Sequence, residues 1–300
     1  MRALLAPFAA VLISLASAGT PAEPLPAAPT QIAAATLDLS HAVDPARIKL
    51  RSSAVLVVDP AKGSALIARN VRTVRPIASI TKLMTAMVTL DAKLPLDHGV
   101  KIVEADVDHI KGTGSRLRLG TRATRRELLR LALMASENRA AAALARSYPG
   151  GTQAFVAAMN RKAAALGMTN SRFRDSTGLS QQNVSTAQDL ARMVLAARKY
   201  TLIRQYTTTA RHTVKLAGSG TLEFRNSNRL VQTGNKDWRI GLSKTGYTAE
   251  AGRCLVMEAT IGGRPLVFVL LNSWGKLTPI GDANRIRRWM EANARPRRVG

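Results

Sequence analysis

Three short motifs, spread over more than half of the chain, limit how this sequence can fold more than any other feature. They are S-x-x-K at Ser79 and Lys82, S-x-N at Ser136 and Asn138, and K-T-G at residues 244–246. A serine hydroxyl is a weak nucleophile until a neighbouring base takes its proton. A lysine can be that base only when burial and a nearby cation lower its pKa. The fold must therefore bring three distant segments together in one partly dry cleft.

The first motif predicts a nucleophile and its base on one helix. Ser79 and Lys82 are three residues apart, so on a helix their side chains share a face. Pro76 can stand just before the helix, and an apolar body follows as far as Leu90. Near the helix N-terminus, free backbone N–H groups would favour a developing oxyanion at Ser79. A second S-x-x-K at 273–276 follows a strand-like run and contains a glycine, so we do not expect it to form such a pair.

The second motif is expected on the opposite wall of the cleft. A helix is predicted from Thr124 to about Ala135, opened by a Thr-x-x-Glu capping box, and the motif follows where this helix ends. Ser136 suits a proton shuttle to a departing amine. Asn138 has both a donor and an acceptor, so it can hold Lys82 and a substrate amide at once.

The third motif follows a strand-like stretch at 238–242, to which an extended substrate can add by backbone hydrogen bonds. Lys244 supplies positive charge for a substrate carboxylate and can depress the pKa of Lys82. Thr245 offers a hydroxyl to the same carboxylate, and Gly246 leaves the backbone open to close approach. Each motif alone has a purely structural explanation, such as a surface serine or a solvated lysine. The ordered combination of all three predicts an active site.

Around these motifs the chain resembles the low-molecular-mass penicillin-binding proteins, which are serine-type D-alanyl-D-alanine peptidases, and it is most similar to their D,D-endopeptidase subgroup. The resemblance implies that a D-Ala carbonyl acylates Ser79, that Lys82 is the base, and that hydrolysis follows without a cofactor. It also implies an oxyanion hole at the backbone N–H groups of Ser79 and Tyr247, and β-lactams as covalent inhibitors. The resemblance covers roughly residues 50–295, and it is carried by segments 76–86, 115–141, 224–230 and 241–257.

The order of predicted elements indicates an α+β fold. Helical patterns dominate from Ser79 to about Tyr200, and strand-like runs lie on both sides of them. This arrangement predicts a mainly antiparallel sheet with flanking helices and an inserted all-helical region. The resemblance implies the same architecture, the penicillin-binding or β-lactamase-like transpeptidase fold, with the cleft at the boundary. Strands are expected at 54–59, 65–69, 213–217, 239–243, 253–260 and 265–271, and a closing helix at 282–292.

The ends of the chain predict export. Arg2 precedes an apolar run that finishes in Ala16-Ser17-Ala18, which is typical of a secretory signal peptide at 1–18; an uncleaved short anchor is the alternative. A leader rich in Pro and Ala is expected at 19–48, a catalytic domain at 49–295 and a basic tail at 296–300. The predicted location is the periplasm. The four histidines show no metal-ligand spacing.

The net charge of +25 would by itself suggest a nucleic-acid or membrane partner. Aromatic residues are only 4% of the chain, and no zinc-finger or RNA-stacking pattern is present, which argues against nucleic acid. Peripheral contact with an anionic wall polymer or anionic lipid head groups accounts for the charge equally well. The charge is therefore a weak guide to function.

The leading hypothesis is a D,D-endopeptidase that hydrolyses D-Ala–diaminopimelate cross-links between peptidoglycan stem peptides. A D,D-carboxypeptidase that removes terminal D-Ala remains open, because the cross-link resembles that bond with a larger last residue and motifs do not define pocket size. A class A β-lactamase would need a deacylating glutamate, and segment 171–178 contains none. A non-catalytic wall-binding protein is the alternative of another class, and it would leave Ser79 unacylated.

Overall fold

A computed structural model of the protein describes residues 38–217, 220–234 and 237–294. The predicted signal peptide, residues 19–37 of the predicted leader, and the predicted basic tail lie outside these ranges. Among the residues that the structure describes, no helix combines the length and the apolar character needed to cross a membrane.

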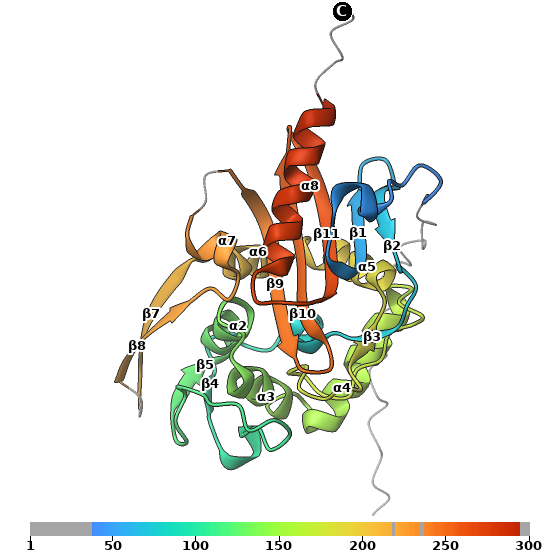
Figure 1. Ribbon diagram of the computed structural model, residues 1–300. Helices are drawn as coiled ribbons and strands as arrows, with labels where there is room; N and C mark the ends of the chain where they lie inside the picture. The colour runs from blue at the N-terminus through green and yellow to red at the C-terminus, as the bar shows by residue number, and fades with distance from the viewer. Residues whose placement is uncertain (1–37, 218–219, 235–236, 295–300) are drawn as a thin grey trace, which may run out of the picture. The chain divides into compact units, whose positions relative to one another are not determined.

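A five-stranded antiparallel sheet forms the centre of this part of the chain, with the strand order β2-β1-β11-β10-β9 (Figure 1). Two of the predicted strands, β1 and β2, form a hairpin, and the last three strands follow one another along the chain. β1 pairs with β11, so segments from the two ends of the described chain lie side by side. The strands are β1 (Ser52–Asp59), β2 (Ser64–Arg69), β9 (Arg239–Thr248), β10 (Gly252–Ile261) and β11 (Arg264–Ser273).

The helical elements and three two-stranded pairs surround this sheet. The helices are α1 (Thr81–Asp91), α2 (Arg125–Met134), α3 (Asn138–Arg146), α4 (Gly151–Ala165), α5 (Ala187–Ala197), α6 (Thr201–Thr207), α7 (Arg229–Gln232) and α8 (Thr278–Ala294), with 3-10 turns η1 (Pro45–Ile48), η2 (Ala78–Ile80) and η3 (Glu104–Asp106). The small pairs are β3 (Arg75–Pro76) with β6 (Val184–Ser185), β4 (Gly99–Lys101) with β5 (Arg122–Thr124), and β7 (Arg211–Leu216) with β8 (Gly220–Arg225). The α+β class and the inserted helical region are confirmed.

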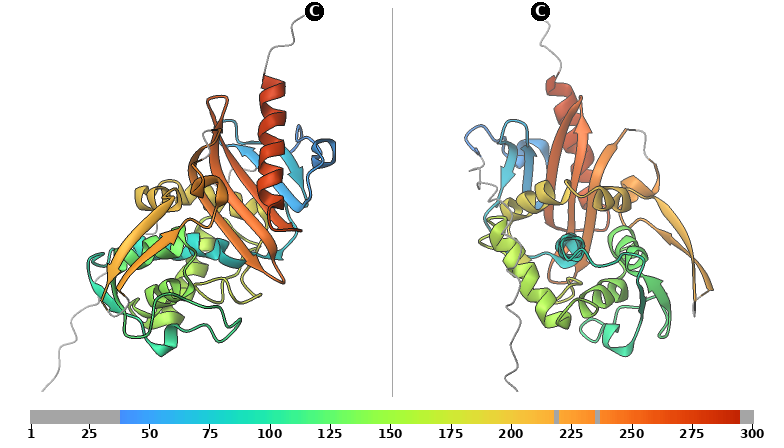
Figure 2. Two further views of the ribbon diagram at one scale, coloured as in Figure 1. Left: turned by 60° about the vertical axis from the view of Figure 1, so that its left-hand side comes forward. Right: turned by 180° about the vertical axis from the view of Figure 1, so that it is seen from behind.

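The sheet has a separate apolar core on each face, and Figure 2 shows α5 and α8 on opposite faces. Alternation along β1 sends Leu56 toward the helical region and Val57 toward α8. On the α8 side, Ile286 and Met290 of the predicted closing helix are buried in one cluster with Phe268 of β11. Burial of each such side chain contributes roughly 1.5–3 kcal/mol. Together the two cores fix the sheet between α8 and the helical region.

The helix boundaries follow from local chemistry that the sequence displays. The Thr124 hydroxyl accepts a hydrogen bond from Glu127 N at 3.1 Å and opens α2. The Thr186 hydroxyl does the same for Asp189 N and opens α5. After α4 the chain turns at Gly167, whose φ is +68°. The start of α2 at Thr124 is the one that the capping box predicted.

Some elements differ from the prediction. Part of the expected leader packs on the fold, since Val43 N donates to Leu66 O at 2.9 Å and Ile48 is buried. The strand predicted at 239–243 continues to Thr248, so the whole K-T-G motif lies inside β9. Neither β8 nor α6 was predicted.

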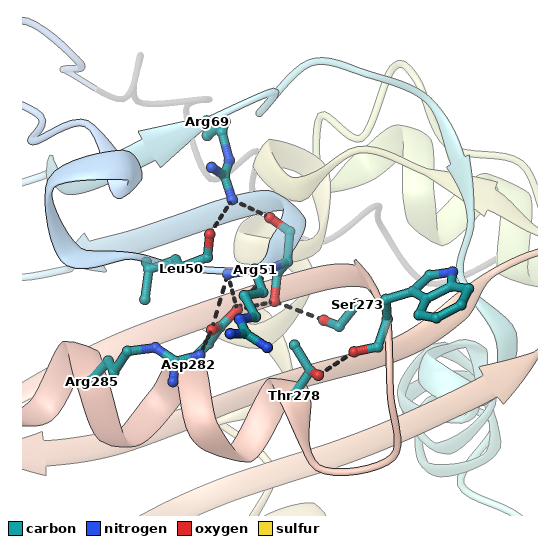
Figure 3. Close-up of polar contacts among 9 residues, drawn as sticks. Leu50, Arg51, Arg69, Ser273, Thr278, Asp282 and Arg285 are labelled. Atoms are coloured by element: carbon teal, nitrogen blue, oxygen red, sulfur yellow. Dashed lines mark hydrogen bonds and ion pairs between the residues drawn. The ribbon is translucent and has the colours of Figure 1, made fainter.

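A buried carboxylate ties α8 to the sheet (Figure 3). Asp282 is fully buried and accepts hydrogen bonds from Ser52 N at 2.7 Å, Ser52 Oγ at 2.6 Å and Arg51 N at 3.1 Å, and it pairs with Arg285 at 2.5 Å. Ser52 Oγ also contacts Ser273 Oγ at 2.7 Å. Ser273, the serine of the second S-x-x-K motif, therefore has a structural role at the end of β11.

We expect Asp282→Ala to lower the free energy of unfolding by about 3–5 kcal/mol, because buried backbone N–H groups and the Arg285 guanidinium lose their acceptor. Urea unfolding followed by circular dichroism measures this. The control is Asp237→Ala, which removes a 60% exposed carboxylate from its pair with Arg287 and should cost less than about 1 kcal/mol. Equal losses in the two variants would contradict the role assigned to Asp282.

Candidate active site

The predicted nucleophile lies in the 3-10 turn η2, immediately before α1, and not on the helix itself. This corrects the sequence prediction, although the consequence for the pair is small. Side chains three residues apart nearly eclipse in a 3-10 turn, and Lys82 Nζ lies 2.9 Å from Ser79 Oγ. Ala78, directly before the serine, has a φ of +46°, in the left-handed region. The sharp turn there presents Ser79 at the mouth of the cleft.

The Lys82 amine is fully buried and contacts three oxygen atoms. These are Ser79 Oγ at 2.9 Å, Asn138 Oδ1 at 2.7 Å and the Thr177 carbonyl at 2.7 Å. The amide and the carbonyl oxygens can only accept, so they take the two N–H bonds of a neutral amine. The lone pair of the nitrogen is then left for the Ser79 hydroxyl. The geometry arranges Lys82 as a base toward Ser79.

Burial is the main cause that lowers the pKa of Lys82, to about 7, against an opposing effect of Asp175, Glu137 and Asp108. The pKa of Lys244 lies well below its ordinary value, again because of burial and then because of the charge on Lys82. The charge on Lys82 therefore disfavours a charge on Lys244, whereas the pKa of Lys82 is lowered by burial and not by the predicted effect of Lys244. A substantial share of Lys82 is neutral near neutral pH.

Lys244 reaches from β9 to the second motif. Its Nζ donates to Ser136 Oγ and to the Thr245 carbonyl, each at 2.9 Å. Ser136 stands between α2 and α3 with a φ of +61°, a conformation that costs a non-glycine residue about 1–3 kcal/mol and occurs preferentially at functional sites. Lys244 is only 1% exposed. Its amine is therefore directed at Ser136 more than at the open cleft.

A loop at 108–113 orients Asn138. The Asn138 amide donates to Thr113 Oγ1 at 2.8 Å, and the Thr113 hydroxyl donates to Asp108 Oδ2 at 2.6 Å. Asp108 also accepts from the backbone N–H groups of Ile110, Lys111 and Thr113, which fixes the loop. One N–H bond of Asn138 remains for a substrate amide, in addition to its contact with Lys82.

A second loop, at 175–180, was missed by the sequence prediction. Asp175 Oδ1 accepts from Thr177 N, Thr177 Oγ1 and Gly178 N, each at 2.6 Å, and Oδ2 accepts from Ser180 N at 2.9 Å. Gly178 has a φ of +85°, and a side chain there would lie 2.0 Å from the carbonyl oxygen of Ala78. The loop thus packs on the backbone of the nucleophile and aims the Thr177 carbonyl at Lys82. The signal was an Asp followed by a turn that ends in Gly.

Gly246 has a clearer reason in the structure than in the sequence. A Cβ at this position would lie 3.0 Å from Ile77 O and 3.1 Å from Ser79 N. β9 therefore passes directly beside the backbone of the nucleophile. Tyr247 follows with a 57% exposed side chain, and the Arg253 guanidinium stacks 4.1 Å from the centre of its ring.

The structure brings all eight predicted site residues together. A cavity of about 640 Å³ opens over Ser79, and the two lysines lie buried beside it. On its far side Thr245 Oγ1 donates to Ser227 Oγ at 2.7 Å, a contact that the sequence prediction did not include. The predicted residues that line the cavity are Ser79, Ser136, Asn138, Thr245, Gly246 and Tyr247.

Comparison with known proteins gives a consistent result. A family model described as D-alanyl-D-alanine carboxypeptidase (Peptidase_S11) matches residues 40–275. The chain is 52% identical over 248 residues to a D-alanyl-D-alanine endopeptidase of Pseudomonas aeruginosa, covering 82% of this chain and 79% of the relative. It is 47% identical to a D-alanyl-D-alanine endopeptidase of Escherichia coli, covering 81% and 78%. Among solved structures, the Streptomyces K15 DD-transpeptidase superposes with a TM-score of 0.75 at 30% identity, covering 81% of this chain and 98% of that one.

We expect the rate at which a reactive acyl donor modifies Ser79 to rise with pH up to about 7 and then level off, because only neutral Lys82 takes the proton. Asp175→Asn should move the midpoint of this rise to lower pH, because it removes a carboxylate that raises the pKa of Lys82. Intact-mass analysis of the adduct against time and pH measures both.

The control for this experiment is Asp97→Asn, which neutralises an 81% exposed carboxylate. It should leave the midpoint where it is in the wild-type protein. A midpoint that Asp175→Asn does not move would show that the charge of Asp175 is not felt at Lys82.

Proposed function

The chain belongs to the D-alanyl-D-alanine carboxypeptidase family of serine peptidases, and from this premise we propose that it is a periplasmic D,D-endopeptidase that hydrolyses the D-Ala–diaminopimelate cross-links of peptidoglycan. The observation that carries the chemistry is the Lys82 amine, held 2.9 Å from Ser79 Oγ by two obligate acceptors. The choice of the cross-link, rather than a terminal D-Ala, as the bond that is cut rests on the similar proteins that are named endopeptidases.

In the acylation step, Lys82 takes the proton of the Ser79 hydroxyl while Oγ attacks the carbonyl carbon of D-Ala. The carbonyl oxygen becomes an oxyanion, and the backbone N–H groups of Ser79 and Tyr247 stabilise it. Because Gly246 brings β9 against the backbone of Ser79, these two N–H groups belong to neighbouring segments. The product of this step is a tetrahedral intermediate bonded to Ser79.

The intermediate collapses when its C–N bond breaks and the departing amine of diaminopimelate receives a proton. Ser136 is placed to deliver that proton, since its hydroxyl contacts Lys244 Nζ at 2.9 Å. Water then attacks the ester carbonyl as Lys82 removes one of its protons, and Ser79 leaves with its hydroxyl restored. One donor stem with a free D-Ala carboxylate and one acceptor stem with a free amine are released.

The same geometry can act on a terminal D-Ala, which is the activity named in the description of the family as a whole. Both bonds carry a carboxylate next to the departing nitrogen. The hydroxyls of Thr245 and Ser227, 2.7 Å apart, are the candidate partners of that carboxylate. A D,D-carboxypeptidase activity is therefore the second candidate. In that reaction the leaving group is free D-Ala, which is smaller than the stem released from a cross-link.

β-Lactams would acylate Ser79 by the same attack on a carbonyl carbon.

The periplasmic location rests on the signal peptide predicted at 1–18. The net charge of +25 suits peripheral contact with an anionic wall polymer or membrane surface. Both proposals can be tested by fractionating cells that express the full chain.

We expect the wild-type protein to gain the mass of one penicillin molecule, and Ser79→Ala to gain none. Hydrolysis of a purified cross-linked muropeptide should fall by a factor of about 10⁴ or more in Ser79→Ala, because the nucleophile is lost. The matched control is Ser273→Ala, which removes the serine of the other S-x-x-K motif and should keep the adduct. A wild-type protein that forms no adduct would favour the non-catalytic wall-binding hypothesis.

A further inference from the structure

The active-site cavity continues beyond the nucleophile, around the edge of the sheet. Thr245 and Tyr247 of β9 pair with Leu255 and Arg253 of β10, and all four residues line the cavity. Leu255 belongs to the apolar core beneath α8. Part of the cavity therefore lies on the α8 face of the sheet, whereas Ser79 lies on the other side of β9.

α7 and the start of α8 form the walls of this extension. In Figure 1, α8 lies in front of β10, and α7 lies to its left. Arg229 comes from α7, and Lys276 and Leu277 come from the segment that leads into α8. We call this extension the acceptor groove, and define it by Arg229, Thr245, Tyr247, Arg253, Lys276 and Leu277.

The acceptor groove is positively charged. Its charged side chains are Arg229, Arg253 and Lys276, and none of the described residues that line the cavity carries a carboxylate. Within the described ranges, these three cations make no ion pair at 4.0 Å or less, whereas nearby Arg285 and Arg287 are paired with carboxylates. Arg253 is held over the ring of Tyr247. Three uncompensated cations around one cavity attract an anionic ligand.

The position of the groove identifies its ligand if the proposed function holds. When the D-Ala carbonyl is at Ser79, the departing amine faces Ser136 and its neighbouring carboxylate reaches Thr245 and Ser227. Whatever is attached beyond that carboxylate continues past Thr245 into the acceptor groove. We propose that the acceptor groove binds the departing stem of the cross-link, a peptide with carboxylates at its diaminopimelate centre and at its own terminus.

This assignment separates the two candidate activities physically. A terminal D-Ala occupies only the part of the cavity next to Thr245, and it presents a single carboxylate. A departing stem extends farther, and beyond the diaminopimelate carboxylate at Thr245 it presents its terminal carboxylate to Arg229, Arg253 and Lys276. Each exposed cation is worth a factor of about two to five in binding, so two of them together change the rate several-fold to more than tenfold.

The test compares three acyl donors with the full-length enzyme: a purified cross-linked muropeptide dimer, a monomeric pentapeptide and penicillin. In Arg229→Gln/Lys276→Gln we expect kcat/KM for the dimer to fall about tenfold. The values for pentapeptide and for penicillin acylation should change less than about threefold, because neither extends into the groove. Added salt should slow dimer cleavage by the wild-type enzyme more than by this variant.

Two further variants sharpen the test. Arg161→Gln removes an exposed arginine of α4 that does not line the cavity, and it should behave as the wild type. Arg253→Gln should also slow dimer cleavage. Because Arg253 stacks on the ring of Tyr247, the rate at which penicillin acylates this variant shows whether Tyr247 has moved. Unchanged dimer cleavage in the double variant, or an equal loss on all three donors, would overturn the assignment of the groove alone. A wild-type enzyme that forms the penicillin adduct but leaves the dimer intact would overturn the proposed endopeptidase function as well.

Discussion

The burial of the Lys82 amine beside Ser79 is the constraint on which the rest of the site depends. A charged amine is unfavourable in a dry interior, so burial moves the amine toward its neutral form. A neutral amine still needs acceptors for its two N–H bonds. Asn138 supplies one from the helical region and Thr177 supplies the other from a loop, so two separate segments must meet at one nitrogen atom.

The rest of the fold holds these segments to the sheet. β9 is an edge strand, which leaves one row of backbone groups available to an extended peptide. It can lie directly beside the nucleophile only because Gly246 has no side chain, and the loop on the other side comes as close only because of Gly178. On the opposite face Asp282 fixes α8 to β1, and this keeps the sheet in register behind the cleft.

The sequence predicted the parts of the site that depend on residue type, and missed those that depend on tertiary contact. The ordered motifs identified Ser79, Lys82 and their partners, and capping chemistry located the start of α2. The 3-10 turn at Ser79 was missed because three residues carry no periodic signal. Asp175 was missed because its role depends on hydrogen bonds from the backbone N–H groups of Thr177 and Gly178. No residue pattern in the sequence shows where those N–H groups point. The direction of Lys244 depends on Ser136, which is 108 residues away.

Proton transfer and anion recognition place opposite demands on a cation. The base must lose its charge near neutral pH, and burial lowers the pKa of Lys82 to about 7. A partner for carboxylates must keep its charge at that same pH, and a guanidinium on a wet surface does so. The amine of Lys244 faces Ser136, whereas Arg229 and Arg253 line the cavity, so we infer that these arginines suit the carboxylates of a departing stem. In the proposed function the two kinds of cation lie on opposite sides of β9, which lets both processes operate at one pH.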